Sequence, residues 1–175
     1  VNWTNRFPEE FKKYRGYDIF PYLPVMTGRI VESPELSNRF LQDLRRTVSD
    51  CIYENHYMLF KELAHKHGLM IDPESGGPCY TPVDALQIMS ISDIPHGEYW
   101  ARSISHVASE GARLSVRQSA CVAHTNGKRF VEAEGPTSIG PQWERSPKDL
   151  KGILDRIFCS GVNRLVWHAF VSSPK

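Results

Sequence analysis

The feature that most constrains the fold of this chain is an alternation of short apolar segments with longer helical patterns. Several strand-like segments follow Gly68 in the chain. Between the later segments, apolar residues recur at helical spacing. Strands that alternate with helices in this way pair in parallel and form an α/β fold. The segments predicted to be strands are residues 69–71, 86–91, 130–134 and 165–170.

The sequence predicts three helices. Ser33 and Pro34 are typical of a helix start, and an apolar stripe recurs every three to four residues from Leu36 until Gly68. This pattern is long for a globular helix, so a break near residues 37–40 is expected. A helix is also predicted around residues 112–123, and Ser146 with Asp149 forms a capping pattern before another. The apolar face of that last helix consists of Leu150, Ile153, Leu154, Ile157 and Phe158.

Two α/β architectures fit this alternation. A doubly wound sheet usually has a glycine-rich phosphate turn after a strand, and the sequence contains neither G-x-G-x-x-G nor G-x-x-x-x-G-K-[ST]. The prediction is therefore part of a (β/α)8 TIM-type barrel, with parallel strands inside and helices outside. No linker or repeat divides residues 1–175, so they are predicted to belong to one domain.

Charge and hydropathy limit the expected partners. The 175 residues include 21 Lys and Arg against 20 Asp and Glu, a formal net charge of +1. This balance gives no reason to expect a nucleic acid partner. No apolar run approaches the roughly 20 residues that a membrane-spanning helix needs.

Acidic residues follow the predicted strands. In a barrel the carboxyl ends of the strands form one rim, where active sites are built. Carboxylates that converge there suit acid–base hydrolysis. The alternative is that each acid is a solvated loop residue or a partner of a helix N-terminus. The residues concerned are Asp72, Glu74, Asp93, Glu98, Glu132 and Glu134, with His168 near the end of the fourth segment.

Alternation along residues 130–134 separates two of these acids. Glu132 and Glu134 share one face of the strand, while Val131 and Ala133 share the other. The apolar pair is expected to pack against outer helices, which directs both acids into the barrel. Glu134 lies nearer the rim and is the better candidate for catalysis. Glu132 lies deeper and is expected to be a structural or metal-supporting group.

Aromatic residues accompany the acids: Tyr99, Trp100, Trp143 and Trp167. Flat aromatic faces beside carboxylates suit sugar rings, whose C–H faces stack while their hydroxyls form hydrogen bonds. A core role is the alternative for each of them. His124 stands at a predicted helix end, where the helix dipole favours it.

These residues lie within a longer pattern of motifs in consistent order. The most specific are Gly97-Glu98-Tyr99-Trp100 and Ala133-Glu134; Asn2-Trp3-Thr4, Gly16-Tyr17-Asp18, Glu74-Ser75-Gly76-Gly77-Pro78 and Gly161-Val162-Asn163-Arg164 are further examples. In this pattern the chain resembles the catalytic barrel of glycoside hydrolase family 106, the α-L-rhamnosidases.

The resemblance implies an inverting hydrolase that removes terminal α-L-rhamnose, with a calcium ion in the sugar site and a secreted or periplasmic location. It implies that Glu134 is the general base. Glu98 is expected to be a second essential carboxylate that assists the water, binds the sugar or supports the metal. Residues expected to bind the substrate are Glu74, Trp100, His124, Trp143 and His168.

Two departures from the family pattern affect these expectations. Gly135-Pro136 stands where the family usually has an aromatic residue, two positions after the base. The family's proton donor is expected before Asn2-Trp3-Thr4, upstream of Val1. A complete barrel takes about 250 residues, so the chain is expected to be an internal part of one. The alternatives are a non-catalytic carbohydrate-binding barrel module and a glycosidase of different sugar specificity.

Overall fold

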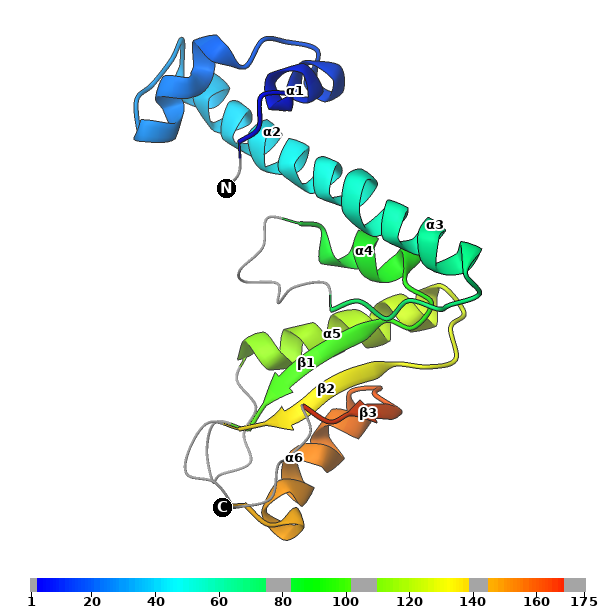
Figure 1. Cartoon of the computed structure of the whole chain (residues 1–175). Helices are drawn as coiled ribbons and strands as arrows, with labels where there is room; N and C mark the ends of the chain where they lie inside the picture. Colours follow the sequence, from blue (N-terminus) through cyan, green and yellow to red (C-terminus); the bar gives the residue numbers. More distant parts are fainter. Residues whose placement is uncertain (1–2, 75–82, 102–109, 139–144, 169–175) are drawn as a thin grey trace, which may run out of the picture. The chain divides into compact units, whose positions relative to one another are not determined.

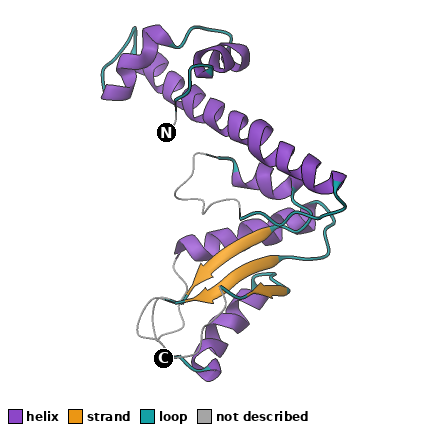
Figure 2. Cartoon of the chain, viewed as in Figure 1, coloured by secondary structure: helices purple, strands orange, loops and turns teal. Residues whose placement is uncertain are grey.

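The computed structural model of the chain describes residues 3–74, 83–101, 110–138 and 145–168 (Figures 1 and 2). The chain divides into two compact units, Val1–Phe60 with Pro82–Asp84, and Lys61–Thr81 with Ala85–Lys175. Within the described residues, no helix combines the length and apolar character that crossing a membrane requires.

The first unit is helical. It contains α1 (Phe7–Arg15), the 3-10 helix η1 (Phe20–Thr27), α2 (Pro34–Ile52) and the π-helical segment η2 (Tyr53–Met58). Its core consists of Phe7, Phe11, Ile19, Val25 and Phe40. Polar contacts tie α1 to α2, because Arg15 forms an ion pair with Asp50 and donates to the Thr47 hydroxyl at 2.9 Å.

The predicted start of the long helix is confirmed, and the predicted break is wrong. The Ser33 hydroxyl accepts a hydrogen bond from the Leu36 N–H at 3.2 Å, and α2 then runs without interruption to Ile52. Within α2 the Ser37 hydroxyl accepts a hydrogen bond from the Val31 N–H at 2.9 Å, which ties the preceding segment to the helix. The irregular part is η2 instead, after which α3 (Leu59–Lys66) completes the helical segment.

The second unit is built on a three-stranded parallel sheet. Its strands are β1 (His96–Trp100), β2 (Glu132–Thr137) and β3 (Arg164–Val166), which lie side by side in chain order. Helix α5 (Glu110–Thr125) connects β1 to β2, and α6 (Pro147–Cys159) connects β2 to β3 (Figure 1). The predicted parallel pairing and α/β class are confirmed.

Both connecting helices contribute to one core on one face of the sheet. Tyr99, Val131 and Ala133 from the strands pack there with Val116 and Ala120 of α5. From α6, Ile153 and Ile157 join the same cluster. The prediction that Val131 and Ala133 pack against helices is confirmed, and the polar residues of the strands lie on the opposite face.

The predicted strand at residues 86–91 is wrong, because this segment forms helix α4 (Ala85–Ile91). Its buried residues Ala85, Ile88 and Met89 recur at helical spacing. The Lys128 ammonium donates to the carbonyl oxygens of Met89 at 3.3 Å and Ser90 at 2.6 Å. A distant cation therefore satisfies the C-terminal carbonyls of this short helix.

The predicted strand at residues 69–71 is also not a strand. Ile71 is buried, and its carbonyl accepts hydrogen bonds from Asp93 at 2.9 Å and Ile94 at 3.3 Å. The chain reaches the sheet three residues later, where Glu74 forms an isolated parallel bridge with His96. The predicted strand at residues 130–134 is confirmed with a shift, since β2 begins at Glu132. For the predicted strand at 165–170, β3 covers Arg164–Val166, and residues beyond 168 lie outside the described part.

The core beneath the sheet generates a stability prediction. Ile153→Ala removes a fully buried side chain (0% exposed) from the α6 face that packs on β2. Loss of burial and the resulting cavity are expected to lower the local free energy of unfolding by about 2–5 kcal/mol. Hydrogen–deuterium exchange of peptides from β2 and α6 in the full-length protein measures the change. Phe158→Ala, at a 44% exposed position of the same helix, is the control and should change exchange little.

Candidate active site

The polar face of the sheet is organised by the register of β1 and β2. His96 is paired with Glu132, and Glu98 is paired with Glu134. Because side chains alternate along a strand, His96, Glu98 and Trp100 lie on the face away from the helices, as do Glu132 and Glu134. The parallel register therefore produces two successive rows of ionisable side chains, one above the other.

The row nearer the carboxyl ends of the strands contains three carboxyl groups. Glu98 and Glu134 are half-buried neighbours, and the carboxyl of Glu74 forms a hydrogen bond with that of Glu134. Burial, this hydrogen bond and the charges of Glu134 and Glu98 raise the pKa of Glu74 to about 7. Glu74 therefore retains its proton to a higher pH than a free glutamate does, and its carboxyl can donate that proton to Glu134.

Trp100 contacts the carboxylate of Glu98. Its indole N–H donates a hydrogen bond to Oε1 of Glu98. The Trp100 ring also lies edge-on to the ring of His168, with 5.9 Å between centroids. His168 in turn contacts the Thr137 hydroxyl through Nδ1 at 3.1 Å. The structure therefore brings Trp100 and His168 to the same end of the sheet as the carboxyl row.

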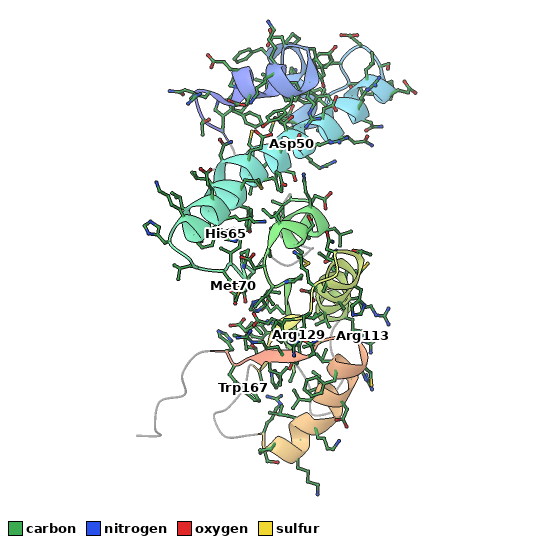
Figure 3. All side chains as sticks on the ribbon, turned by 90° about the vertical axis from the view of Figure 1, so that its right-hand side faces the viewer. Asp50, His65, Met70, Arg113, Arg129 and Trp167 are labelled. Atoms are coloured by element: carbon green, nitrogen blue, oxygen red, sulfur yellow. The ribbon has the colours of Figure 1, made fainter. Side chains whose placement is uncertain are left out.

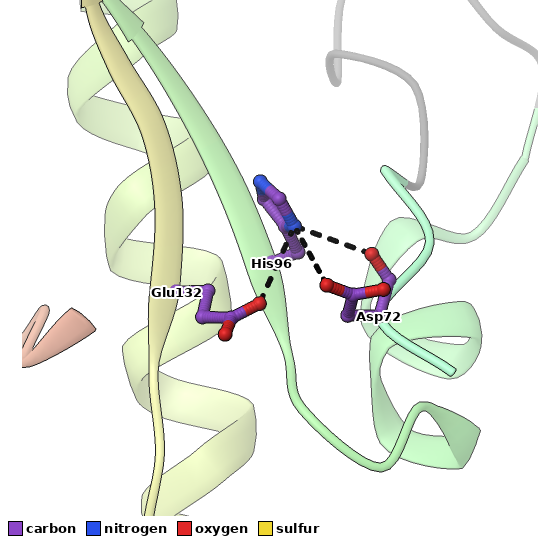
Figure 4. A group of neighbouring side chains, drawn as sticks. All are labelled: Asp72, His96 and Glu132. Atoms are coloured by element: carbon purple, nitrogen blue, oxygen red, sulfur yellow. Dashed lines mark hydrogen bonds and ion pairs between the residues drawn. The ribbon is translucent and has the colours of Figure 1, made fainter. Parts of the chain in front are cut away.

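The deeper row is more buried. Glu132 is 1% exposed, and its Oε1 accepts from the Arg164 Nε at 2.7 Å. His96 places Nδ1 3.8 Å from Oε2 of Glu132 and 3.2 Å from the backbone carbonyl of Asp72 (Figure 4). Burial and the neighbouring carboxyl group of Asp72 raise the pKa of Glu132 to about 7, although Arg164 opposes the effect. The prediction that Glu132 lies deeper than Glu134 is confirmed.

Two glycines permit the close packing that positions these rows. A Cβ on Gly97 would lie 3.0 Å from the Ser119 hydroxyl oxygen and 3.1 Å from the Ser115 carbonyl oxygen, so its absence lets α5 approach β1. Gly135 has a φ of +147°, and a Cβ there would lie 2.7 Å from the Tyr99 carbonyl oxygen. The Ser115 hydroxyl also accepts from the Glu98 N–H at 3.0 Å, which ties that strand residue to the helix.

The other predicted residues lie elsewhere. His124 is exposed in the last turn of α5, which precedes β2, so the structure does not bring it to the carboxyl row. Trp143 lies outside the described residues. Tyr99 is fully buried in the core, and Trp167, after β3, is 64% exposed (Figure 3).

Asp93 has a different role from the rim position expected for it. Its carboxylate accepts from the Ile71 N–H at 2.7 Å and lies 2.8 Å from the His65 Nε2. Burial opposes ionisation, yet these hydrogen bonds lower the pKa of Asp93 below its ordinary value. Asp93 therefore fastens the segment around Ile71 and is separate from the carboxyl row.

Sequence reasoning missed His96, Thr137 and Arg164. His96 lies between Pro95 and Gly97, and such flanking residues are more typical of a loop than of a strand. Arg164 stands at the start of β3, where only the register reveals that it faces Glu132. A signal for His96 was present, since it precedes Glu98 by two residues and so shares its face in any extended conformation.

Comparisons with known proteins identify the family of the chain. The family model for glycoside hydrolase family 106, described as alpha-L-rhamnosidase, matches residues 1–175. The chain belongs to this family. A solved rhamnosidase structure from Novosphingobium sp. PP1Y superposes with a TM-score of 0.80 at 35% identity, over 97% of the chain and 16% of that protein.

A second relative carries a different description. It is a protein of Formosa agariphila that is provisionally described as a beta-glucuronidase, and it is 38% identical over 174 residues. The match covers 99% of this chain and 14% of that protein. The chain thus spans about a seventh of the length of the relatives that it matches.

The raised pKa of Glu74 predicts how the stability of the protein depends on pH. The pKa of Glu74 in the folded protein, about 7, exceeds its ordinary value of 4.5, so the folded state retains a proton that the unfolded chain has lost. Stability therefore falls as the pH rises from about 4.5 to about 7. Glu74→Gln should remove this component, because an amide donates to Glu134 at every pH. Melting temperatures of the full-length protein across this range measure it. The exposed Glu62→Gln is the control, and an unchanged pH slope in Glu74→Gln would contradict the raised pKa of Glu74.

Proposed function

We propose that this chain forms part of the active site of an inverting glycoside hydrolase that removes terminal α-L-rhamnose. The observation that carries the proposal is the pairing of Glu98 with Glu134, beside Glu74, on one face of a parallel sheet. Helices α5 and α6 share a core on the opposite face, as the outer helices of a barrel do. Membership of family 106 supports the same function.

In this proposal Glu134 is the general base. Its half-buried carboxylate removes a proton from water while the water oxygen attacks the anomeric carbon on the side opposite the leaving group. A neighbouring strand lies about 4.8 Å away, whereas the acid and base of inverting enzymes are roughly 6.5–9.5 Å apart. This difference favours an acid outside the Glu98–Glu134 pair, as the resemblance implies. Glu98 then orients the water or a sugar hydroxyl.

The remaining groups are proposed to bind the sugar. Trp100 offers an aromatic surface beside the carboxylates, and the ring of His168 lies next to it. When Glu74 is protonated, its carboxyl donates a hydrogen bond to Glu134, and the carboxylate of Glu134 can still accept another from the sugar or water. Rhamnose is a neutral deoxysugar, and a face that carries Glu74, Glu98 and Glu134 suits it better than a negatively charged glucuronic acid.

Calcium is part of the proposal through the family resemblance. The carboxyl oxygens of Glu74 and Glu98 belong to the donor class that Ca²⁺ prefers. The charges of Glu134 and Glu98 raise the pKa of Glu74, so positive charge is stabilising at this place. When bound, a calcium ion would supply that charge and an additional contact for sugar hydroxyls.

Substitution of the base tests the proposal. Glu134→Gln in the full-length protein should lower kcat for an aryl α-L-rhamnoside by about 10²–10⁴-fold, because glutamine cannot accept the proton of water. Release of the aryl group measures the rate, and NMR of the first-formed anomer should show inversion. Glu62→Gln is the matched surface control.

Each rival function has a distinct outcome in the same assays. Normal turnover by Glu134→Gln would contradict the role of Glu134. Turnover of an aryl β-glucuronide in preference to the rhamnoside would contradict the sugar assignment. Rhamnose binding without any turnover by the full-length protein would support a non-catalytic carbohydrate-binding module instead.

The indole of Trp100 provides a finer test of Glu98. Trp100→Phe keeps an aromatic ring but removes the N–H that donates to Glu98. Loss of one charge-assisted hydrogen bond is expected to lower kcat/KM by roughly 10-fold or more. If Trp100→Phe has no effect in an otherwise wild-type protein, Glu98 does not depend on this contact. In a Glu98→Gln background the effect should shrink, because the carboxylate is already absent.

A further inference from the structure

A second cluster of ligating groups lies beneath the row of Glu98 and Glu134. It consists of Asp72, His96 and Glu132, and its members stand at the starts of β1 and β2 and in the segment before Glu74 (Figure 4). One nitrogen and two carboxylate oxygens of these residues all lie within 4.8 Å of one another. The His96 Nδ1 is 3.8 Å from Oε2 of Glu132 and 4.0 Å from Oδ2 of Asp72.

The contacts within the chain leave this cluster incomplete. Oε1 of Glu132 accepts from Arg164, but Oε2, which faces His96 (Figure 4), has no hydrogen-bond donor among the described residues. The Glu132 side chain is 1% exposed, so bulk water does not replace the missing donor. The His96 Nδ1 lies 3.2 Å from the backbone carbonyl oxygen of Asp72 but is too far from both carboxylate oxygens for a hydrogen bond to either.

A cation at the centre would satisfy all three groups. Metal ions bound by imidazole and carboxylate ligands have bond lengths of about 2.0–2.2 Å, which place tetrahedral ligand atoms about 3.3–3.6 Å apart. The spacings of 3.8 and 4.0 Å are slightly longer, so binding of an ion would draw the carboxylates inward by a few tenths of an ångström. Arg164 would orient one of the metal ligands, because it donates to the oxygen of Glu132 that faces away from the centre of the cluster.

We propose that Asp72, His96 and Glu132 bind a divalent first-row transition-metal ion of the Mn²⁺ and Zn²⁺ class. Calcium prefers six to eight oxygen ligands, whereas this cluster contributes an imidazole nitrogen with two carboxylates. The site is distinct from the calcium ion implied for the sugar, since its residues lie one row deeper than Glu98 and Glu134. In the structure Nδ1 donates to the backbone carbonyl of Asp72, because a carbonyl oxygen can only accept. A metal ion bound at Nδ1 displaces that proton and leaves the ring proton on Nε2, which is on the side of the ring away from the two acids (Figure 4).

The test uses the full-length protein after removal of metals with a chelator. Titration with Co²⁺, followed by its visible absorption, should show one ion bound through nitrogen and oxygen ligands that is lost in both His96→Gln and Glu132→Gln. His65→Gln is the matched control, because that exposed histidine pairs with Asp93 outside the cluster. Arg164→Met retains all three ligands and should weaken binding by about 10–100-fold.

Two further measurements keep the proposal testable if a variant fails to fold. In the wild-type protein loaded with Mn²⁺, pulsed electron paramagnetic resonance should detect coupling to an imidazole nitrogen. Ca²⁺ at equal concentration should not displace Co²⁺. Identical Co²⁺ binding by wild-type and folded His96→Gln, or absence of the nitrogen coupling, would overturn the site. Displacement by equimolar Ca²⁺ would overturn the proposed metal class. These outcomes are independent of rhamnoside turnover.

Discussion

The parallel register between β1 and β2 is the constraint on which the candidate site depends. It pairs His96 with Glu132 and Glu98 with Glu134, so residues two apart in sequence become two rows in space. A shift of one residue would turn the acids toward the helices and the apolar residues toward the polar face. The core of Val131, Ala133 and the two helices prevents such a shift, because those side chains have nowhere else to pack.

Burial gives the two rows different properties. In the upper row the Glu74 carboxyl forms a hydrogen bond with that of Glu134, and Trp100 donates to Glu98, so each carboxyl group has a polar neighbour. In the lower row Glu132 is almost fully buried, and Arg164 binds one of its two oxygens. The upper row is therefore the more accessible of the two, whereas the lower row is enclosed.

Connections outside the sheet keep these rows in place. Asp93 bonds the backbone of Ile71, and this contact brings the following residues, Asp72 and Glu74, to the edge of β1. The side chain of Asn163 accepts from the Val131 N–H at 2.9 Å and donates to the Arg129 carbonyl at 2.9 Å, which sets the start of β3 against β2. Polar residues that the sequence suggested for chemistry thus include some, such as Asp93, that stabilise the backbone around the site.

The sequence alone determined the features that depend on local spacing. The caps at Ser33 and Ser146, the apolar face of α6 and the alternation that separates Glu132 from Val131 follow from residues close together in the chain. The family pattern was also visible in the order of its motifs, and the match over residues 1–175 confirms it.

Only the tertiary structure decided the features that depend on distant partners. Residues 86–91 have an apolar composition that suits a strand or a buried helix, and contacts such as those from Lys128 favour the helix. His96 and Arg164 acquire their roles through pairing with Glu132, which lies more than 30 residues from each of them in the chain. Local spacing specifies which face a side chain takes, but the register of strands specifies which side chains meet, and burial then sets their charge.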